Sequence, residues 1–187
     1  MKSSKKKISP KNMGIVVWFT GLSGSGKTTI AAAVKKELLE RGQRVCLLDG
    51  DEVRRVRHRH LSFSREDIRE NNRLIAELAK EQQLSHDFVL VPIIAPFRQD
   101  RAMARRIIGG QFLEVFIDCP LRVCAERDVK GLYQKARAGE INNLIGVSAT
   151  NPYEPPLAPD GVIKTGEMNI GSSVKALLDL VSHQCQD

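Results

Sequence analysis

Three features are missing from this sequence: a long apolar run, a cysteine pair at metal-binding spacing, and any acidic residue near the N-terminus. A membrane-spanning helix needs about 18 or more apolar residues in a row, and no stretch of the 187-residue chain approaches that length. The apolar run at 15–19 is also too short for a secretory signal peptide. We therefore expect a cytoplasmic protein with no membrane partner.

The arrangement of the cysteines excludes the common structural zinc sites. The four cysteines form no C-x-x-C pair, and no histidine lies at metal-ligand spacing from them; they are Cys46, Cys119, Cys124 and Cys185. Cys46 and Cys119 lie in or beside apolar runs, so we expect buried thiols there. A disulfide is disfavoured in the reducing cytosol.

The absence of acids near the N-terminus makes the charge distribution uneven. Residues 1–12 carry five lysines and no acid, whereas the rest of the chain has 24 basic against 22 acidic residues. We predict that residues 1–13 form a disordered basic leader and that residues 14–187 form one domain. A basic leader can contact nucleic acid, but the balanced charge of the remainder argues against nucleic acid as a partner.

Short buried strands alternate with amphipathic helices along the domain. This alternation predicts an α/β fold, a parallel sheet with helices on both faces and right-handed crossovers. In such folds, ligands bind at the carboxyl ends of the strands. The expected strands are 15–19, 45–48, 88–94, 113–117 and 161–164, and the expected helices are 28–41, 65–83, 100–108, 121–128, 130–138 and 172–182.

A glycine-rich motif lies between the first strand and the first helix. Residues 21–28 match G-x-x-x-x-G-K-[ST] throughout, a loop whose backbone N–H groups, with the helix dipole, bind phosphates. Lys27 is expected to reach the β- and γ-phosphates as a catalytic residue, and the Thr28 hydroxyl to hold Mg²⁺. The motif predicts ATP and Mg²⁺ as cofactors, bound by Gly21, Leu22, Ser23, Gly24, Ser25, Gly26, Lys27, Thr28 and Thr29.

The second strand ends at a pair of aspartates that should face the same crevice. Asp49 is our candidate for a catalytic carboxylate and metal ligand, because a carboxylate there can orient or deprotonate a hydroxyl, or hold Mg²⁺. Asp51 is assigned equally to substrate binding and to capping the turn at 52–57. A basic cluster lies just beyond these aspartates, and one or two of its arginines are expected to hold an anionic substrate while the others form a solvated face; they are Arg54, Arg55, Arg57 and Arg59. Arg98 and Arg101 follow the third strand and also lie at a carboxyl end.

A second basic segment follows the fourth strand. Its cations are expected to form a lid that closes over ATP, with Arg127 as an ATP ligand, and the alternative is an ordinary basic surface helix. The cations concerned are Arg122, Arg127, Lys130, Lys135 and Arg137.

Several longer motifs resemble the adenylylsulfate (APS) kinase family over residues 14–181. The most specific is the run from Lys130-Gly131-Leu132-Tyr133 to Gly139-Glu140-Ile141. The other matching segments are 19–29, 48–51, 63–64, 70–71, 95–101, 127–129 and 152–154.

The resemblance implies a P-loop kinase that moves the γ-phosphoryl of ATP to the 3′-hydroxyl of adenylylsulfate, giving PAPS. It implies that Asp49 is the base, that Phe63 stacks on the acceptor base and that Lys130 reaches the acceptor from the lid. Asp51, Arg54, Asn71, Ile94 and Leu144 are the remaining expected acceptor ligands. The resemblance also implies a homodimer.

The chain departs from the family's pattern mainly in the acceptor region. Ile68 stands where the family has an arginine, with Arg69 next to it, and Leu144 stands where the family has a phenylalanine that sandwiches the adenine. Glu52 replaces an asparagine, and Ala95 replaces a serine.

These departures leave several functions open. The first is adenylylsulfate kinase, with Arg69 and Leu144 in adapted roles. The second is a related kinase for a different nucleotide, such as cytidine diphosphoramidate. The third is an ATP-binding switch without phosphoryl transfer, and the fourth is a nucleic-acid-binding module that only the basic leader supports.

Overall fold

The computed structural model describes residues 13–184 and contains one five-stranded parallel sheet. The strand order is β2-β3-β1-β4-β5, and every pairing is parallel. The strands are β1 (Ile15–Thr20), β2 (Val45–Leu47), β3 (Phe88–Pro92), β4 (Phe112–Asp118) and β5 (Gly161–Lys164). The α/β prediction is confirmed. The predicted leader, apart from its last residue, lies outside the described residues.

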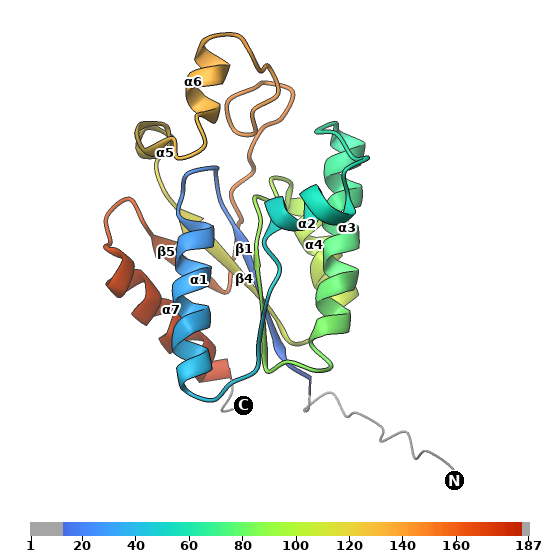
Figure 1. Cartoon of the computed structure of the whole chain (residues 1–187), viewed down its shortest axis with the longest axis vertical. Coiled ribbons are helices and arrows are strands. Elements are labelled where there is room, and N and C mark those ends of the chain that lie inside the picture. The colour runs from blue at the N-terminus through green and yellow to red at the C-terminus, as the bar shows by residue number, and fades with distance from the viewer. Residues whose placement is uncertain (1–12, 185–187) are drawn as a thin grey trace.

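Helices cover both faces of the sheet (Figure 1). α1 (Lys27–Glu40) and α7 (Ile170–Gln184) pack on one face, and α3 (Arg65–Gln82) and α4 (Arg98–Ile108) on the other. A short helix, α2 (Gly50–Arg57), follows β2. α5 (Leu121–Arg127) and α6 (Leu132–Arg137) stand apart from the two layers, at the top of Figure 1.

β1 lies at the centre of the sheet, and its alternating side chains divide between the two cores. Val17 and Phe19 join the core beneath α1 and α7, whereas Val16 and Trp18 join the core beneath α3 and α4. All four are fully buried, and burial of each such side chain stabilises the fold by about 1.5–3 kcal/mol. The burial of this central strand therefore fixes the position of the loop that follows it, at the carboxyl end of β1.

The observed elements differ from the expected ones mainly at their ends. The segment after β2, expected as a turn, is the helix α2, because the Asp49 side chain accepts hydrogen bonds from Asp51 N and Glu52 N and so caps it. β3 ends at Pro92 rather than at residue 94. The second lid helix begins at Leu132 rather than at residue 130, because Gly131 has a left-handed backbone, with φ of 65°.

Within residues 13–184, no helix combines the length and the apolar character that crossing a bilayer requires.

Candidate active site

The glycine-rich motif forms the loop between β1 and α1, as predicted. Gly24 has φ of 76°, and a Cβ atom there would lie 2.8 Å from the Cys124 carbonyl oxygen. Only glycine accommodates both the left-handed backbone and this close approach. The loop is therefore packed directly against α5, at the base of the predicted lid.

Lys27 lies at the first position of α1, and its side chain folds back over the loop. Its Nζ donates to the carbonyl oxygens of Gly21, at 2.9 Å, and Leu22, at 2.6 Å. Burial, and secondarily the positive charge of Lys130, lowers the pKa of Lys27 from 10.5 to about 8. An ammonium desolvated in this way is stabilised by an incoming anion, as a phosphate-binding lysine requires.

Thr28, on α1, and Asp49, at the start of α2, are hydrogen-bonded to each other. Thr28 Oγ1 donates to Asp49 Oδ2 at 2.8 Å, while Asp49 Oδ1 accepts from the backbone N–H groups of Asp51 and Glu52. Of the two alternatives for Asp51, the capping role is wrong, because Asp49 supplies the cap. Asp49 thus combines a structural role with a place beside the phosphate-binding loop.

Thr28 and Asp49 carry oxygen atoms of the kind that Mg²⁺ binds. Mg²⁺ usually binds through one or two carboxylates together with substrate phosphates and water, not through a cage of protein ligands. Residues 13–184 hold no cluster of three or more His, Cys, Asp or Glu side chains suited to a metal. Thr28 and Asp49 fit such a partly protein-bound ion.

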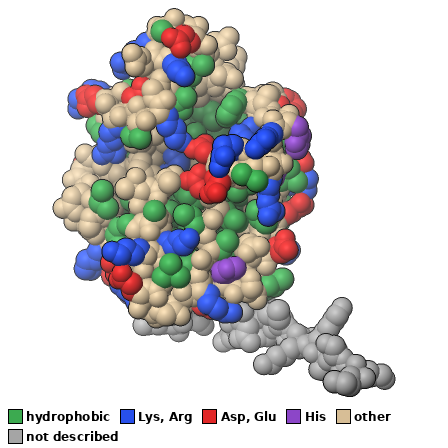
Figure 2. Space-filling view, viewed as in Figure 1, with side chains coloured by type: hydrophobic (Ala, Val, Ile, Leu, Met, Phe, Trp, Pro, Cys, Tyr) green, Lys and Arg blue, Asp and Glu red, His purple; other side chains and the backbone are tan. Residues whose placement is uncertain are grey.

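The acceptor residues predicted on α2 face the predicted lid. The exposed carboxylate of Asp51 pairs with Lys130 Nζ, from the segment between α5 and α6. In the space-filling view, acidic and basic side chains lie together near the middle of this face, below α5 and α6 (Figure 2). This ion pair therefore joins the segment between α5 and α6 to α2.

Arg54 and Phe63 lie together on the same side of the site. The Arg54 guanidinium donates to the carbonyl oxygens of Leu61 and Ser62, and its Cζ lies 4.5 Å from the centre of the Phe63 ring. Phe63 keeps 46% of its surface exposed. An exposed aromatic face at this place suits stacking by a base.

Asn71 is buried and bonded to a residue that sequence reasoning missed. His58 Nδ1 lies 2.9 Å from Asn71 Oδ1, and both residues are buried. His58 follows the C-terminus of α2, whereas Asn71 lies on α3. Nothing in the residue pattern indicated this pair, because it forms only when the two helices pack together.

The three apolar positions singled out in the acceptor region do not meet at one place. Ile68 packs with Phe97 and Ile145, and Ile94 lies at the margin of this group. Leu144 is instead buried among Cys119, Cys124 and Tyr133. Arg69 is exposed, whereas its neighbour Ile68 is buried. The Arg69 side chain therefore does not take the buried place that Ile68 fills on α3.

The predicted lid is tied to the phosphate-binding loop through Tyr133. The Tyr133 hydroxyl donates to the Ser23 carbonyl oxygen at 2.8 Å. Asp128 holds the start of α6, since its carboxylate accepts from the N–H groups of Tyr133 and Gln134. The residue pattern gave no signal for the Tyr133 contact, which spans 110 positions of the chain.

Arg127, predicted as an ATP ligand, is held at the rim of the loop. Its Nη2 donates to the Thr165 carbonyl oxygen at 2.7 Å, and the Thr165 hydroxyl donates to the Ser25 carbonyl oxygen at 2.7 Å. Thr165, which sequence reasoning also missed, therefore connects the arginine to the phosphate-binding loop.

A network at the carboxyl end of β1 supports the other side of the loop. Thr20 Oγ1 donates to the Ile94 carbonyl oxygen at 2.7 Å and lies 2.9 Å from the Tyr153 hydroxyl. Ala95 beside it has φ of 42°, which is unusual for a residue other than glycine. The ends of β1 and β3 are thus joined to the segment that carries Tyr153.

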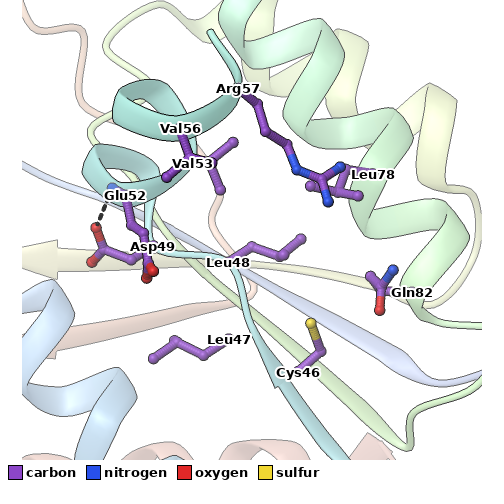
Figure 3. A pocket seen from close by; sticks show the side chains of 10 residues that line it. All are labelled: Cys46, Leu47, Leu48, Asp49, Glu52, Val53, Val56, Arg57, Leu78 and Gln82. Atoms are coloured by element: carbon purple, nitrogen blue, oxygen red, sulfur yellow. Dashed lines mark hydrogen bonds between the residues drawn. The ribbon is translucent and has the colours of Figure 1, made fainter. Parts of the chain in front are cut away.

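A cavity of about 330 Å³ lies behind Asp49, between α2, α3 and β2 (Figure 3). Most of its lining is apolar, and Asp49 and Glu52 stand at one end. Neither the phosphate-binding loop nor the acceptor residues Asp51 and Arg54 line it. We therefore infer that catalysis takes place beside the phosphate-binding loop, where Thr28 and Asp49 meet, rather than in this cavity.

Comparison with known proteins agrees with this geometry. A family model described as adenylylsulphate kinase matches residues 13–164. The chain belongs to the adenylylsulfate kinase family. An adenylyl-sulfate kinase of Bacillus pumilus is 46% identical over 172 residues, covering 91% of this chain and 86% of its own. One of Shewanella amazonensis is 45% identical over 177 residues, covering 94% and 88%.

Several solved structures also resemble this chain in their fold. The APS kinase of Mycobacterium tuberculosis in complex with AMPPNP and APS aligns with a TM-score of 0.87 and 42% identity, covering 91% of this chain and 98% of that one. A hexameric APS kinase from Thiobacillus denitrificans aligns with a TM-score of 0.68 and 32% identity, over 94% of this chain but 30% of that one. A gluconokinase at 19% identity and a TM-score of 0.61 shares the fold.

Proposed function

We propose that this protein is an ATP-dependent kinase that phosphorylates the ribose 3′-hydroxyl of adenylylsulfate, giving PAPS and ADP. The observation that carries the proposal is the meeting of Thr28 with Asp49, at 2.8 Å, beside a complete phosphate-binding loop. Membership of the adenylylsulfate kinase family supports the choice of acceptor.

On the donor side, the loop residues 21–29 bind the phosphates of ATP. Lys27 exchanges its bonds to the Gly21 and Leu22 carbonyls for bonds to phosphate oxygens, and its charge stabilises the transferring group. Arg127 lies at the rim of this loop and contributes to ATP binding. Thr28 and Asp49 would hold Mg²⁺, which would supply charge to neutralise the phosphates.

On the acceptor side, Asp49 orients the 3′-hydroxyl and accepts its proton as the oxygen attacks the γ-phosphorus and ADP departs. Phe63 stacks on the base, and Asp51, Arg54, Asn71 and Lys130 bind the rest of the nucleotide. Ile94 and Leu144 contribute apolar surface. Because Lys130 already pairs with Asp51, acceptor binding has to rearrange this contact between the lid and α2.

An ADP-release assay tests the proposal. The protein is incubated with ATP and Mg²⁺ and, separately, with adenylylsulfate and with a set of cytidine and uridine nucleotides, cytidine diphosphoramidate included. We expect turnover with adenylylsulfate at micromolar concentration. Turnover with a pyrimidine nucleotide alone would replace the proposed acceptor, and ADP release with none of them would remove the kinase proposal.

We further propose that the protein works as a homodimer in the cytoplasm, where its ATP donor is available. Light scattering on the purified chain tests the dimer, and a monomeric mass throughout the micromolar range would contradict it.

A further inference from the structure

α4 carries four arginines that line a cavity with none of the phosphate-binding or acceptor residues in its lining. They are Arg98, Arg101, Arg105 and Arg106. Residues three, four, seven and eight positions apart share one side of a helix, and these four line a cavity of about 390 Å³. The other lining residues are Ala102, Glu114, Pro156 and Leu157.

Two of these arginines are neutralised by acids of the protein. Arg101 Nε lies 2.6 Å from Glu114 Oε1, and Arg101 is only 2% exposed. Arg105 Nη2 lies 2.5 Å from Asp160 Oδ2 and 3.9 Å from Glu114 Oε2. These two cations therefore build the wall of the cavity.

Arg98 and Arg106 are not neutralised in this way. Within residues 13–184 neither forms an ion pair, and the side chain of Arg98 donates only to the Pro155 carbonyl oxygen, at 2.8 Å. The one acid of α4, Asp100, is buried and held by Arg65. The Glu154 carboxylate accepts from the backbone N–H of Arg98. Free guanidinium groups thus remain at both ends of the cavity.

The spacing of the two free cations indicates the kind of ligand. Eight residues of helix separate Arg98 from Arg106, which is about 12 Å along the axis. A single phosphate does not span two such groups, whereas a chain of linked phosphoryl groups meets both. Guanidinium groups bind phosphate oxygens through paired, charge-assisted hydrogen bonds.

We propose that this cavity is a second anion site, separate from the phosphate-binding loop, that takes a linear polyphosphate chain, either free or as part of a nucleoside triphosphate. Arg98 and Arg106 bind the two ends of the chain. Arg101 and Arg105, with their acids, shape the cavity between them.

Isothermal titration with inorganic tripolyphosphate, without metal, tests the site in protein that carries Lys27→Ala to remove binding at the loop. We expect one site in this variant, and a loss of affinity of about tenfold or more on adding Arg98→Gln or Arg106→Gln, since each removes charged hydrogen bonds. Lys36→Gln, on the exposed face of α1, is the matched control and should leave the affinity unchanged. Inorganic phosphate should bind more weakly than tripolyphosphate, and titration with ATP shows whether a nucleoside triphosphate occupies the same site.

Several outcomes would overturn the proposal. They are no binding of tripolyphosphate at millimolar concentration, an affinity unchanged from the Lys27→Ala parent when Arg98→Gln or Arg106→Gln is added, or phosphate binding as tight as tripolyphosphate. If Lys27→Ala fails to fold, the two arginine substitutions are made in otherwise unaltered protein. Tripolyphosphate should then fill two sites, and each arginine substitution should weaken only one of them. The kinase assay is independent of these results, because neither arginine is among the residues to which we give a catalytic, ATP-binding or acceptor-binding role.

Discussion

At the scale of single residues, Asp49 has two tasks that substitution can separate. Its carboxylate accepts from Thr28 and caps α2. Asparagine caps a helix as well as aspartate does, but it carries no charge for a proton or a metal.

We therefore expect Asp49→Asn to lower kcat by about 10²–10⁴-fold with little change in the thermal midpoint. Asp49→Ala should lose the same activity and also about 1 kcal/mol of stability with the cap. Steady-state kinetics and thermal unfolding of both variants check this. A fully active Asp49→Asn would show that the carboxylate is structural only.

The second residue-scale prediction concerns the pH dependence of ATP binding. Burial and the charge of Lys130 lower the pKa of Lys27 to about 8. Phosphate needs the charged ammonium, so ATP affinity should be full below that pH and fall as the pH rises through about 8, rather than through the ordinary 10.5.

Titration of ATP binding from pH 6.5 to 9.5 measures this dependence, since the fall should be visible about a unit either side of the pKa. Lys27→Arg is the control, because its guanidinium stays charged over the whole range. The prediction is wrong if both proteins show the same profile.

At the scale of elements, the bond from Tyr133 to Ser23 joins α6 to the phosphate-binding loop. Tyr133→Phe leaves the buried Ser23 carbonyl without this donor, a cost of about 1–3 kcal/mol. We expect the lid to open more often, which raises KM for ATP about tenfold and speeds proteolysis within residues 128–145.

Tyr153→Phe is the matched control for the lid. This substitution also removes a tyrosine hydroxyl, which lies 2.9 Å from Thr20 Oγ1 at a partly buried position, but Tyr153 lies outside the lid. We expect it to lower the thermal midpoint without changing the rate of lid proteolysis. Equal rates of lid proteolysis in the unaltered, Tyr133→Phe and Tyr153→Phe proteins would argue that the Tyr133–Ser23 bond does not hold the lid.

At the scale of the whole molecule, Arg101 connects α4, β4 and the segment before the last strand. Besides its pair with Glu114, it donates to the carbonyl oxygens of Ala95 and Glu154, both at 2.7 Å. Removing one partner of a buried ion pair typically costs about 3–5 kcal/mol, because the other charge stays buried and unpaired.

Arg101→Met should therefore lower stability by about 3–5 kcal/mol, or the thermal midpoint by roughly 10 °C. Arg122→Ala removes an exposed pair with Glu126 and should change stability by about 0.5 kcal/mol or less. Thermal and urea unfolding of the two variants provide the comparison. A similar small loss in both would mean that Arg101 is not essential to the packing.

Local patterns predicted most of the elements but few of their contacts. The buried strand at 15–19 and the helix after it were recognised because apolar spacing depends only on near neighbours. α2 was missed as a helix because its stability depends on the Asp49 cap and on packing of Val53 against the core. The arginines could not be sorted from sequence, since Arg101 is buried and Arg106 is exposed on one short helix.

The sequence by itself determined the phosphate-binding loop, the parallel α/β fold and the family. These features reside in contiguous residues whose spacing sets the backbone geometry. Only the tertiary structure decided that Asp49 meets Thr28, that Lys130 reaches Asp51 and that Tyr133 closes on Ser23. Those partners are 21, 79 and 110 positions apart, so they meet only through the packing of the whole sheet and its helices.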